Sequence, residues 1–237
     1  MRALDPATTL DLCDRGMSKS PLERALLVIE AAGADPNGRD EAGSPADWPL
    51  GAVNKALLEQ RGSIFGGQLE LLANCPGCGS ICQSEIDCWQ LAAVSGASAE
   101  ERTLKVGRKR VAFRVPTIGD VMTAARSGRP AGEALAQRLI ADNSVMLDER
   151  LLSALADGVA RADPLSSIEI ALRCPECGDQ WVEPLHVVDV LWTELKARSD
   201  RLVMEVARLA SAFGWTERDV LSMSGLRRQR YLDLLPS

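Results

Sequence analysis

Histidine is nearly absent from this sequence, and several other features that define large functional classes are missing. The 237 residues include one histidine, His186, so a Ser-His-Asp or Cys-His mechanism would depend on this single side chain. We expect His186 at the surface or at the start of a helix. Gly66 and Gly67 lack the spacing and the lysine of a phosphate-binding loop. No carboxylate pair is singled out as catalytic, so we expect a protein that is not an enzyme and has no small-molecule substrate.

Long apolar runs and an excess of positive charge are also missing. The best apolar run, Ala25 to Ala32, is interrupted by Glu30 and falls far short of the roughly 20 residues of a membrane span. The N-terminus carries acids where a signal peptide has its apolar centre, so we expect no export signal. A net charge of -6 argues against indiscriminate binding to nucleic acid or to anionic membrane. We therefore expect a cytoplasmic protein with no membrane partner.

Cysteine, in contrast, is present in a distinctive pattern. The chain has seven cysteines, and four of them form the pairs Cys75-Pro76-Gly77-Cys78 and Cys174-Pro175-Glu176-Cys177, each followed by glycine. Proline fixes one dihedral of a tight turn, and the glycine accepts a positive φ, so each pair can fold into a knuckle. Two knuckles supply four thiolates in a tetrahedron around Zn²⁺. The sequence therefore predicts one structural zinc bound by Cys75, Cys78, Cys174 and Cys177.

Other uses of these cysteines are thiol redox chemistry and disulfide bonding. A redox CxxC usually opens a helix, whereas strand-like residues follow both pairs here, and an odd number of cysteines disfavours a disulfide framework. Cys82 aligns with Trp181 and Cys88 aligns with Val187, so both are expected to be buried apolar residues. Cys13 is interpreted in the same way.

The two pairs lie in similar surroundings, 99 residues apart. Residues 69–79 align without gaps on residues 168–178, and alternating apolar residues before each pair indicate a strand. Each unit is therefore expected to be a strand, a knuckle and a second strand. An internal duplication and convergence of two ribbons both fit this pattern.

The rest of the chain is mostly helical in pattern. Ser20 and Glu23 form a capping signature for a helix that ends at Gly33, and Thr216 with Asp219 forms another. Residues 34–48 are expected to be an exposed loop, and residues 103–116 a β-hairpin with one apolar face. Further helices are expected at 50–61, 117–126, 131–141, 146–160 and 187–213, and around Tyr231.

The predicted fold class is α+β, with helical N- and C-terminal regions around a small β centre that contains a two-knuckle zinc ribbon. The expected parts of this composite domain are 1–66 (helices and loop), 67–88 (first knuckle hairpin), 89–162 (β-hairpin and helices), 163–187 (second knuckle hairpin) and 188–237 (C-terminal helices). We expect the zinc to fix the N-terminal helices relative to the long helix near 190–213.

Basic residues form two small groups. Lys105, Arg108, Lys109, Arg110 and Arg114 could contact phosphates, but the acidic chain favours a solvated hairpin face. The arginines near the C-terminus are expected to complement a helix dipole at its C-terminal end; they are Arg227, Arg228 and Arg230.

The C-terminal third resembles the T-even phage-type baseplate proteins of contractile phage tails and phage-derived contractile injection systems. The resemblance is carried by residues 168–172 running into Cys174–Gly178, and by Trp181, Leu191-Trp192, Glu205-Val206, Leu209-Ala210, Gly214–Glu217, Arg228 and Tyr231-Leu232, with Arg114–Thr117 and Asp120 upstream. It implies a non-enzymatic baseplate component or assembly factor whose partners are other baseplate or tail proteins. Incorporation into the finished particle and departure after assembly both fit.

A zinc-ribbon adaptor for nucleic acid or transcription is the alternative from another class, since a fold does not decide a function. The acidic net charge counts against it, so no specific nucleic-acid binding is expected. A thiol oxidoreductase is a third, weaker alternative.

Overall fold

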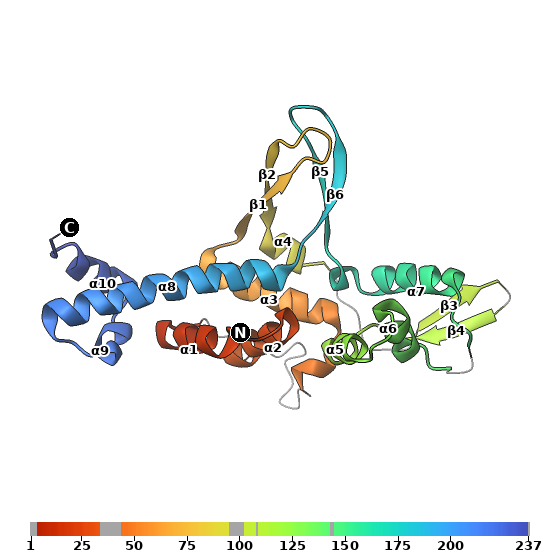
Figure 1. Cartoon of the computed structure of the whole chain (residues 1–237), viewed down its shortest axis with the longest axis horizontal. Coiled ribbons are helices and arrows are strands. Elements are labelled where there is room, and N and C mark those ends of the chain that lie inside the picture. The colour runs from red at the N-terminus through yellow and green to blue at the C-terminus, as the bar shows by residue number, and fades with distance from the viewer. Residues whose placement is uncertain (1–3, 34–43, 95–101, 108, 143–144, 237) are drawn as a thin grey trace. The chain divides into compact units, whose positions relative to one another are not determined.

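The computed structural model describes residues 4–33, 44–94, 102–107, 109–142 and 145–236 (Figure 1). This part of the chain combines helices with small antiparallel two-stranded sheets, which is the predicted α+β class. Its helices are α1 (Pro6–Gly16), α2 (Pro21–Ala32), α3 (Leu50–Phe65), α4 (Cys88–Ala92), α5 (Ile118–Arg126), α6 (Ala131–Leu139), α7 (Glu149–Ala162), α8 (Val187–Phe213), α9 (Glu217–Ser222) and α10 (Gly225–Leu232), with 3-10 turns η1 (Pro45–Asp47) and η2 (Pro164–Ser166).

The strands pair as three hairpins. Their bounds are β1 (Gln68–Asn74) with β2 (Ile81–Asp87), β3 (Arg102–Val106) with β4 (Lys109–Phe113), and β5 (Glu169–Arg173) with β6 (Gln180–Pro184). The hairpin predicted between residues 103 and 116 is thus confirmed, as are the strands on both sides of each cysteine pair.

The chain divides into two compact units. One unit holds the described residues between 44 and 187, including the three hairpins. The other holds residues 4–33 and 188–236, so it is made of helices from both ends of the chain.

Local capping residues set several helix ends. Ser20 and Glu23 form a capping box at the start of α2, and Gly33 ends this helix with a φ of 56°. Thr216 and Asp219 form the same arrangement at α9. Both predicted capping boxes are confirmed. Each could be predicted because it depends only on residues within one helical turn of each other.

The helices of the second unit pack directly on one another around Trp192 of α8. Gly16 of α1 lies so close that a Cβ there would come within 2.0 Å of the Trp192 ring. The guanidinium of Arg24, in α2, lies 4.8 Å from the centre of the same ring. Trp192 thus joins α1 and α2 directly to α8, in the unit that lacks the cysteine pairs. That zinc fixes the N-terminal helices relative to α8 stays a prediction.

In the first unit, the apolar face of the β3–β4 hairpin packs on helices. Leu104, Val111 and Phe113 are buried in one cluster with residues of α6 and α7. Gly158 permits the close approach of α7, since a Cβ there would come within 2.5 Å of Leu104. This packing buries the apolar residues of one face, and Lys105 and Arg110 lie exposed on the opposite face.

Two expectations from the sequence need correction. Trp48 is 5% exposed, so the exposed loop predicted to residue 48 ends earlier; residues 34–43 lie outside the described part. Arg227 and Arg228 lie in the first turns of α10, which begins at Gly225, so they do not complement the negative end of its dipole. Arg230 does lie in the last turn.

Candidate metal centre

The first cysteine pair forms a tight knuckle between β1 and β2. The N–H of Gly79 donates to the carbonyl of Cys75 over 2.9 Å, and the N–H of Cys75 donates to the carbonyl of Ser80 over 2.9 Å. Gly79 has a φ of 76°, which only glycine adopts without strain. The chain therefore reverses direction within a few residues, between β1 and β2.

The second pair repeats this knuckle between β5 and β6. The N–H of Gly178 donates to the carbonyl of Cys174 over 3.0 Å, and the N–H of Cys174 donates to the carbonyl of Asp179 over 2.8 Å. Gly178 has a φ of 78°. The same bonds thus recur 99 residues later, and a helix follows each hairpin at the same offset, α4 at Cys88 and α8 at Val187.

The two knuckles bring four sulfur atoms together. The Sγ atoms of Cys75 and Cys177 are 3.6 Å apart, and so are those of Cys78 and Cys174. All four sulfurs lie within 4.8 Å of one another. In a tetrahedron with sulfurs about 2.3 Å from a zinc ion, neighbouring sulfurs are roughly 3.8 Å apart. The donor atoms and their spacing therefore suit one metal ion such as zinc.

Hydrogen bonds shift the pKa values of these thiols in opposite directions. The backbone N–H of Cys177 lowers the pKa of the Cys174 thiol to about 6. The N–H of Asp179 acts to lower the pKa of Cys177, yet this pKa rises to about 12 because the thiol is hydrogen-bonded to Cys75 and Cys78. Backbone N–H groups therefore favour the thiolate at Cys174, whereas the neighbouring thiols favour the protonated form at Cys177.

The knuckles also touch each other outside the sulfurs. A Cβ at Gly77 would come within 2.8 Å of a carboxylate oxygen of Asp179. The first knuckle has glycine where the second has Glu176, and this glycine leaves room for the Asp179 carboxylate.

Cys82 is buried beside the four sulfurs. It is 6% exposed and forms one apolar cluster with Cys75 and Cys174, against which Trp181 packs. Burial raises the pKa of the Cys82 thiol to about 11, and Cys82 is not one of the four cysteines whose sulfurs could hold one ion. The prediction that Cys82 is buried is confirmed. Cys82 occupies the position on β2 that aligns with Trp181 on β6.

The remaining sequence candidates lie elsewhere. Cys88 is 0% exposed at the start of α4, 3.8 Å from Nη1 of Arg61. Cys13 is buried in α1. His186 is exposed directly before α8, as expected for a residue at a helix start.

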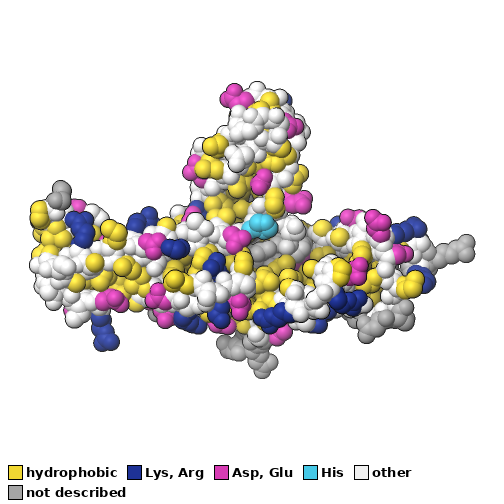
Figure 2. Space-filling view, viewed as in Figure 1, with side chains coloured by type: hydrophobic (Ala, Val, Ile, Leu, Met, Phe, Trp, Pro, Cys, Tyr) yellow, Lys and Arg dark blue, Asp and Glu magenta, His cyan; other side chains and the backbone are white. Residues whose placement is uncertain are grey.

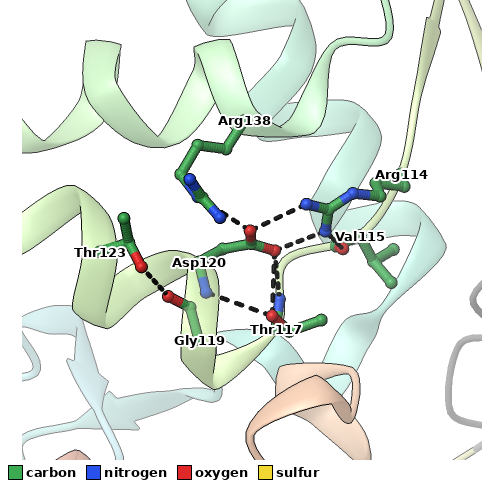
Figure 3. Close-up of polar contacts among 7 residues, drawn as sticks. All are labelled: Arg114, Val115, Thr117, Gly119, Asp120, Thr123 and Arg138. Carbon is green, nitrogen blue, oxygen red and sulfur yellow. Dashed lines mark hydrogen bonds and ion pairs between the residues drawn. The ribbon is translucent and has the colours of Figure 1, made fainter.

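Sequence reasoning missed an ionic cluster around Asp120, which is drawn in Figure 3. Its buried carboxylate binds two arginines: Nη2 of Arg114 donates to it over 2.8 Å, and Nε of Arg138 over 3.0 Å. The N–H of Thr117 donates to it over 3.1 Å, as part of a capping box at α5. The expectation that Arg114 belongs to a solvated basic face is therefore wrong. The Thr117–Asp120 capping signal was visible in the sequence, whereas the pairing with Arg138 depends on how α5 and α6 pack.

The other basic residues of the hairpin are distributed as expected where they are described. Lys105, Lys109 and Arg110 are exposed on β3 and β4, while Arg108 lies outside the described residues.

No family model, no curated protein and no solved structure matches this chain. Among the described residues, no helix is both long enough and apolar enough to cross a membrane.

Proposed function

We propose that Cys75, Cys78, Cys174 and Cys177 bind one structural Zn²⁺, so that the two hairpins form a zinc ribbon. The all-sulfur donor set supports zinc, because soft thiolates in a tetrahedron are typical ligands of this ion. The sulfur spacings of 3.6 Å support a single shared ion. Four protein sulfurs fill the coordination shell and leave no place for a substrate, so the role of the ion is structural.

The ion would act as a cross-link within the first unit. It would join β1–β2 to β5–β6, which are distant in the sequence but supply two sulfurs each. Structural zinc contributes roughly 10–16 kcal/mol to folding in small zinc-finger peptides. A chain with a separate apolar core needs only part of this contribution, so metal loss should loosen the ribbon and leave the helices folded.

The protein as a whole is proposed to be a non-enzymatic component or assembly factor of a phage-like baseplate. This proposal rests on the resemblance of the C-terminal third, and four of the positions that carry it form contacts within the second unit. Trp215 and Tyr231 have ring centres 4.7 Å apart, and Arg228 pairs with Glu205 over 2.7 Å.

A nucleic-acid adaptor is the second candidate, favoured by the exposed Lys105 and Arg110 on one hairpin face. Such a protein would bind DNA or RNA in a salt-dependent way. The acidic net charge of -6 weighs against this candidate.

The proposed function is tested by deleting the gene in the organism that encodes it and examining its particles by electron microscopy. The baseplate proposal predicts tails or injection particles that lack a baseplate or fail to assemble, with recovery when the wild-type gene is returned. A gene with Cys174→Ser should not restore assembly, whereas a gene with Cys82→Ser should. Normal particles after deletion would exclude the baseplate role, and tail-tube, sheath and spike genes next to this one would support it.

A further inference from the structure

The first zinc hairpin carries two carboxylates side by side on one exposed face. Glu70 of β1 and Glu85 of β2 are direct cross-strand partners, and both are exposed. Like charges in this position destabilise the pairing of two strands. The second hairpin lacks this arrangement, because Glu169, which aligns with Glu70, is paired with Pro184.

Two large apolar side chains lie on the same face of the first hairpin. Leu72 is 61% exposed and Ile81 is 72% exposed. Side chains alternate along a strand, so Leu72 shares a face with Glu70, and Ile81 shares it through its partner Asn74. We call this surface the acidic face; it consists of Glu70, Leu72, Asn74, Ile81, Gln83 and Glu85.

The β3–β4 hairpin carries the opposite charge in the same arrangement. Lys105 and Arg110 are direct cross-strand partners, and both are exposed. The other side of this hairpin is buried through Leu104 and Val111, so the charged side is the one left for a partner. We call this surface the basic face; it consists of Thr103, Lys105, Arg110 and Ala112.

The two faces match in charge and in spacing. Cross-strand partners have Cβ atoms about 4.5–5.5 Å apart in any antiparallel pair, so two carboxylates on one hairpin can meet two cations on another at the same time. On the visible side of the first unit, acidic side chains lie along the two cysteine hairpins, and both basic and acidic side chains lie at the end that holds β3 and β4 (Figure 2). We propose that the acidic face of one copy of this chain binds the basic face of a second copy.

A second copy explains both like-charge pairs, whereas a nucleic acid would explain only Lys105 and Arg110. Each pair costs stability in the isolated chain, and the opposite pair offsets that cost in the assembly. Leu72 and Ile81 would be covered in the same contact.

The proposed contact is head-to-tail, because it joins two different surfaces. Each added copy leaves one acidic and one basic face free at the ends of the assembly, so association continues with concentration or closes into a ring. Ion pairs at an exposed contact are screened by salt, so the assembly should dissociate as the ionic strength rises.

Sedimentation velocity over a range of protein concentrations, with the metal bound, tests this proposal at about 20 mM and about 500 mM salt. The wild type should form larger species at low salt that dissociate at high salt. Glu70→Lys with Glu85→Lys, and separately Lys105→Glu with Arg110→Glu, should each weaken association at least about tenfold. The quadruple variant, which combines all four substitutions, reverses the charge of both faces. It should associate again, because the two faces are once more opposite in charge.

Variants on the second hairpin provide the matched control. Glu169→Lys with Arg173→Glu alters charges on β5 and should leave association unchanged. Circular dichroism and zinc content should equal those of the wild type in every variant; where a reversal disturbs folding, Glu70→Gln with Glu85→Gln removes the charges more gently and should still weaken association.

Three outcomes overturn the proposal. The first is a wild type that stays monomeric at low salt at every concentration. The second is a folded quadruple variant that does not associate. The third is a Lys105→Glu, Arg110→Glu variant that loses binding to a DNA oligonucleotide while its self-association is unchanged, which would assign the basic face to nucleic acid.

Discussion

Nε of Arg228, in α10, donates a hydrogen bond of 2.7 Å to a carboxylate oxygen of Glu205, in α8. Nη1 of the same arginine donates over 2.7 Å to the carbonyl of Met223, which follows α9. Arg228 is 6% exposed, so these bonds form where water competes weakly. One side chain thus fixes the last helices of the chain to α8.

Replacing Arg228 should destabilise the second unit. Arg228→Leu keeps apolar bulk but leaves Glu205 and the Met223 carbonyl without this donor, so the free energy of unfolding should fall by about 2 kcal/mol. Arg227→Leu, at an exposed neighbour in the same helix, should change it by no more than about 0.5 kcal/mol. Urea denaturation measures both variants, and equal effects would contradict the assigned role of Arg228.

Two helical glycines should respond to alanine in opposite directions. A Cβ at Gly51 would come within 1.8 Å of a carboxylate oxygen of Asp163, which accepts the Gly51 N–H over 2.9 Å. Gly51→Ala should therefore destabilise the protein. A Cβ at Gly132 meets nothing within 4 Å, so Gly132→Ala should stabilise α6 by about 0.5–1 kcal/mol. Thermal unfolding compares the variants; a stabilising Gly51→Ala would mean that Asp163 does not hold α3 as described.

The ionic cluster at Asp120 should make the free energy of unfolding depend on pH in the acidic range. Burial acts to raise the pKa of Asp120, but the bonds from Arg114 and Thr117 outweigh it and lower the pKa from 3.8 to about 2. Because the folded-state pKa is the lower one, the carboxylate stabilises the fold fully above about pH 4, and this contribution is lost as the pH falls towards about 2.

Asp120→Asn should therefore lower the free energy of unfolding by about 1–2 kcal/mol at neutral pH, and less as the pH falls below about 4. Asp157→Asn, at an exposed position of α7, is the control and should have little effect at any pH. Denaturation across this pH range gives the comparison, and a difference from the wild type that stays constant with pH would exclude the proposed linkage.

Zinc retention should also fall with pH. Zinc binds cysteine as the thiolate, so protons compete with the metal for the four sulfurs as the pH falls. The N–H of Cys177 favours one of these thiolates by lowering the pKa of Cys174 to about 6. Zinc should stay bound at neutral pH and be released as the solution is acidified, as a colorimetric chelator can measure. Release that is the same at about pH 8 and about pH 4 would show that thiolates do not hold the ion.

The sequence was informative wherever structure depends on neighbouring residues. The helix ends at Ser20 and Thr216 follow from capping residues within one turn. The four-cysteine site could be predicted because each CxxC pair forms a local turn, and two such pairs supply the four sulfurs of one site.

Contacts between distant residues were not predictable in the same way. Arg138 pairs with Asp120 because α5 and α6 pack together, and Arg228 is buried because α10 returns to α8. The contact of Gly16 with Trp192 joins the two ends of the chain. None of these pairs leaves a periodic or local signal, so each arginine looked like an ordinary surface charge.

The central claim is that sulfurs from two hairpins hold one zinc ion, and elemental analysis of the purified protein tests it most directly. Wild-type protein and Cys82→Ser should each contain about one zinc per chain, and Cys174→Ser should contain none, since three sulfurs leave the site incomplete. Cys174→Ser should keep most of its helical circular dichroism. Wild-type protein without zinc, two zinc ions per chain, or a Cys174→Ser variant that retains its zinc would contradict the account.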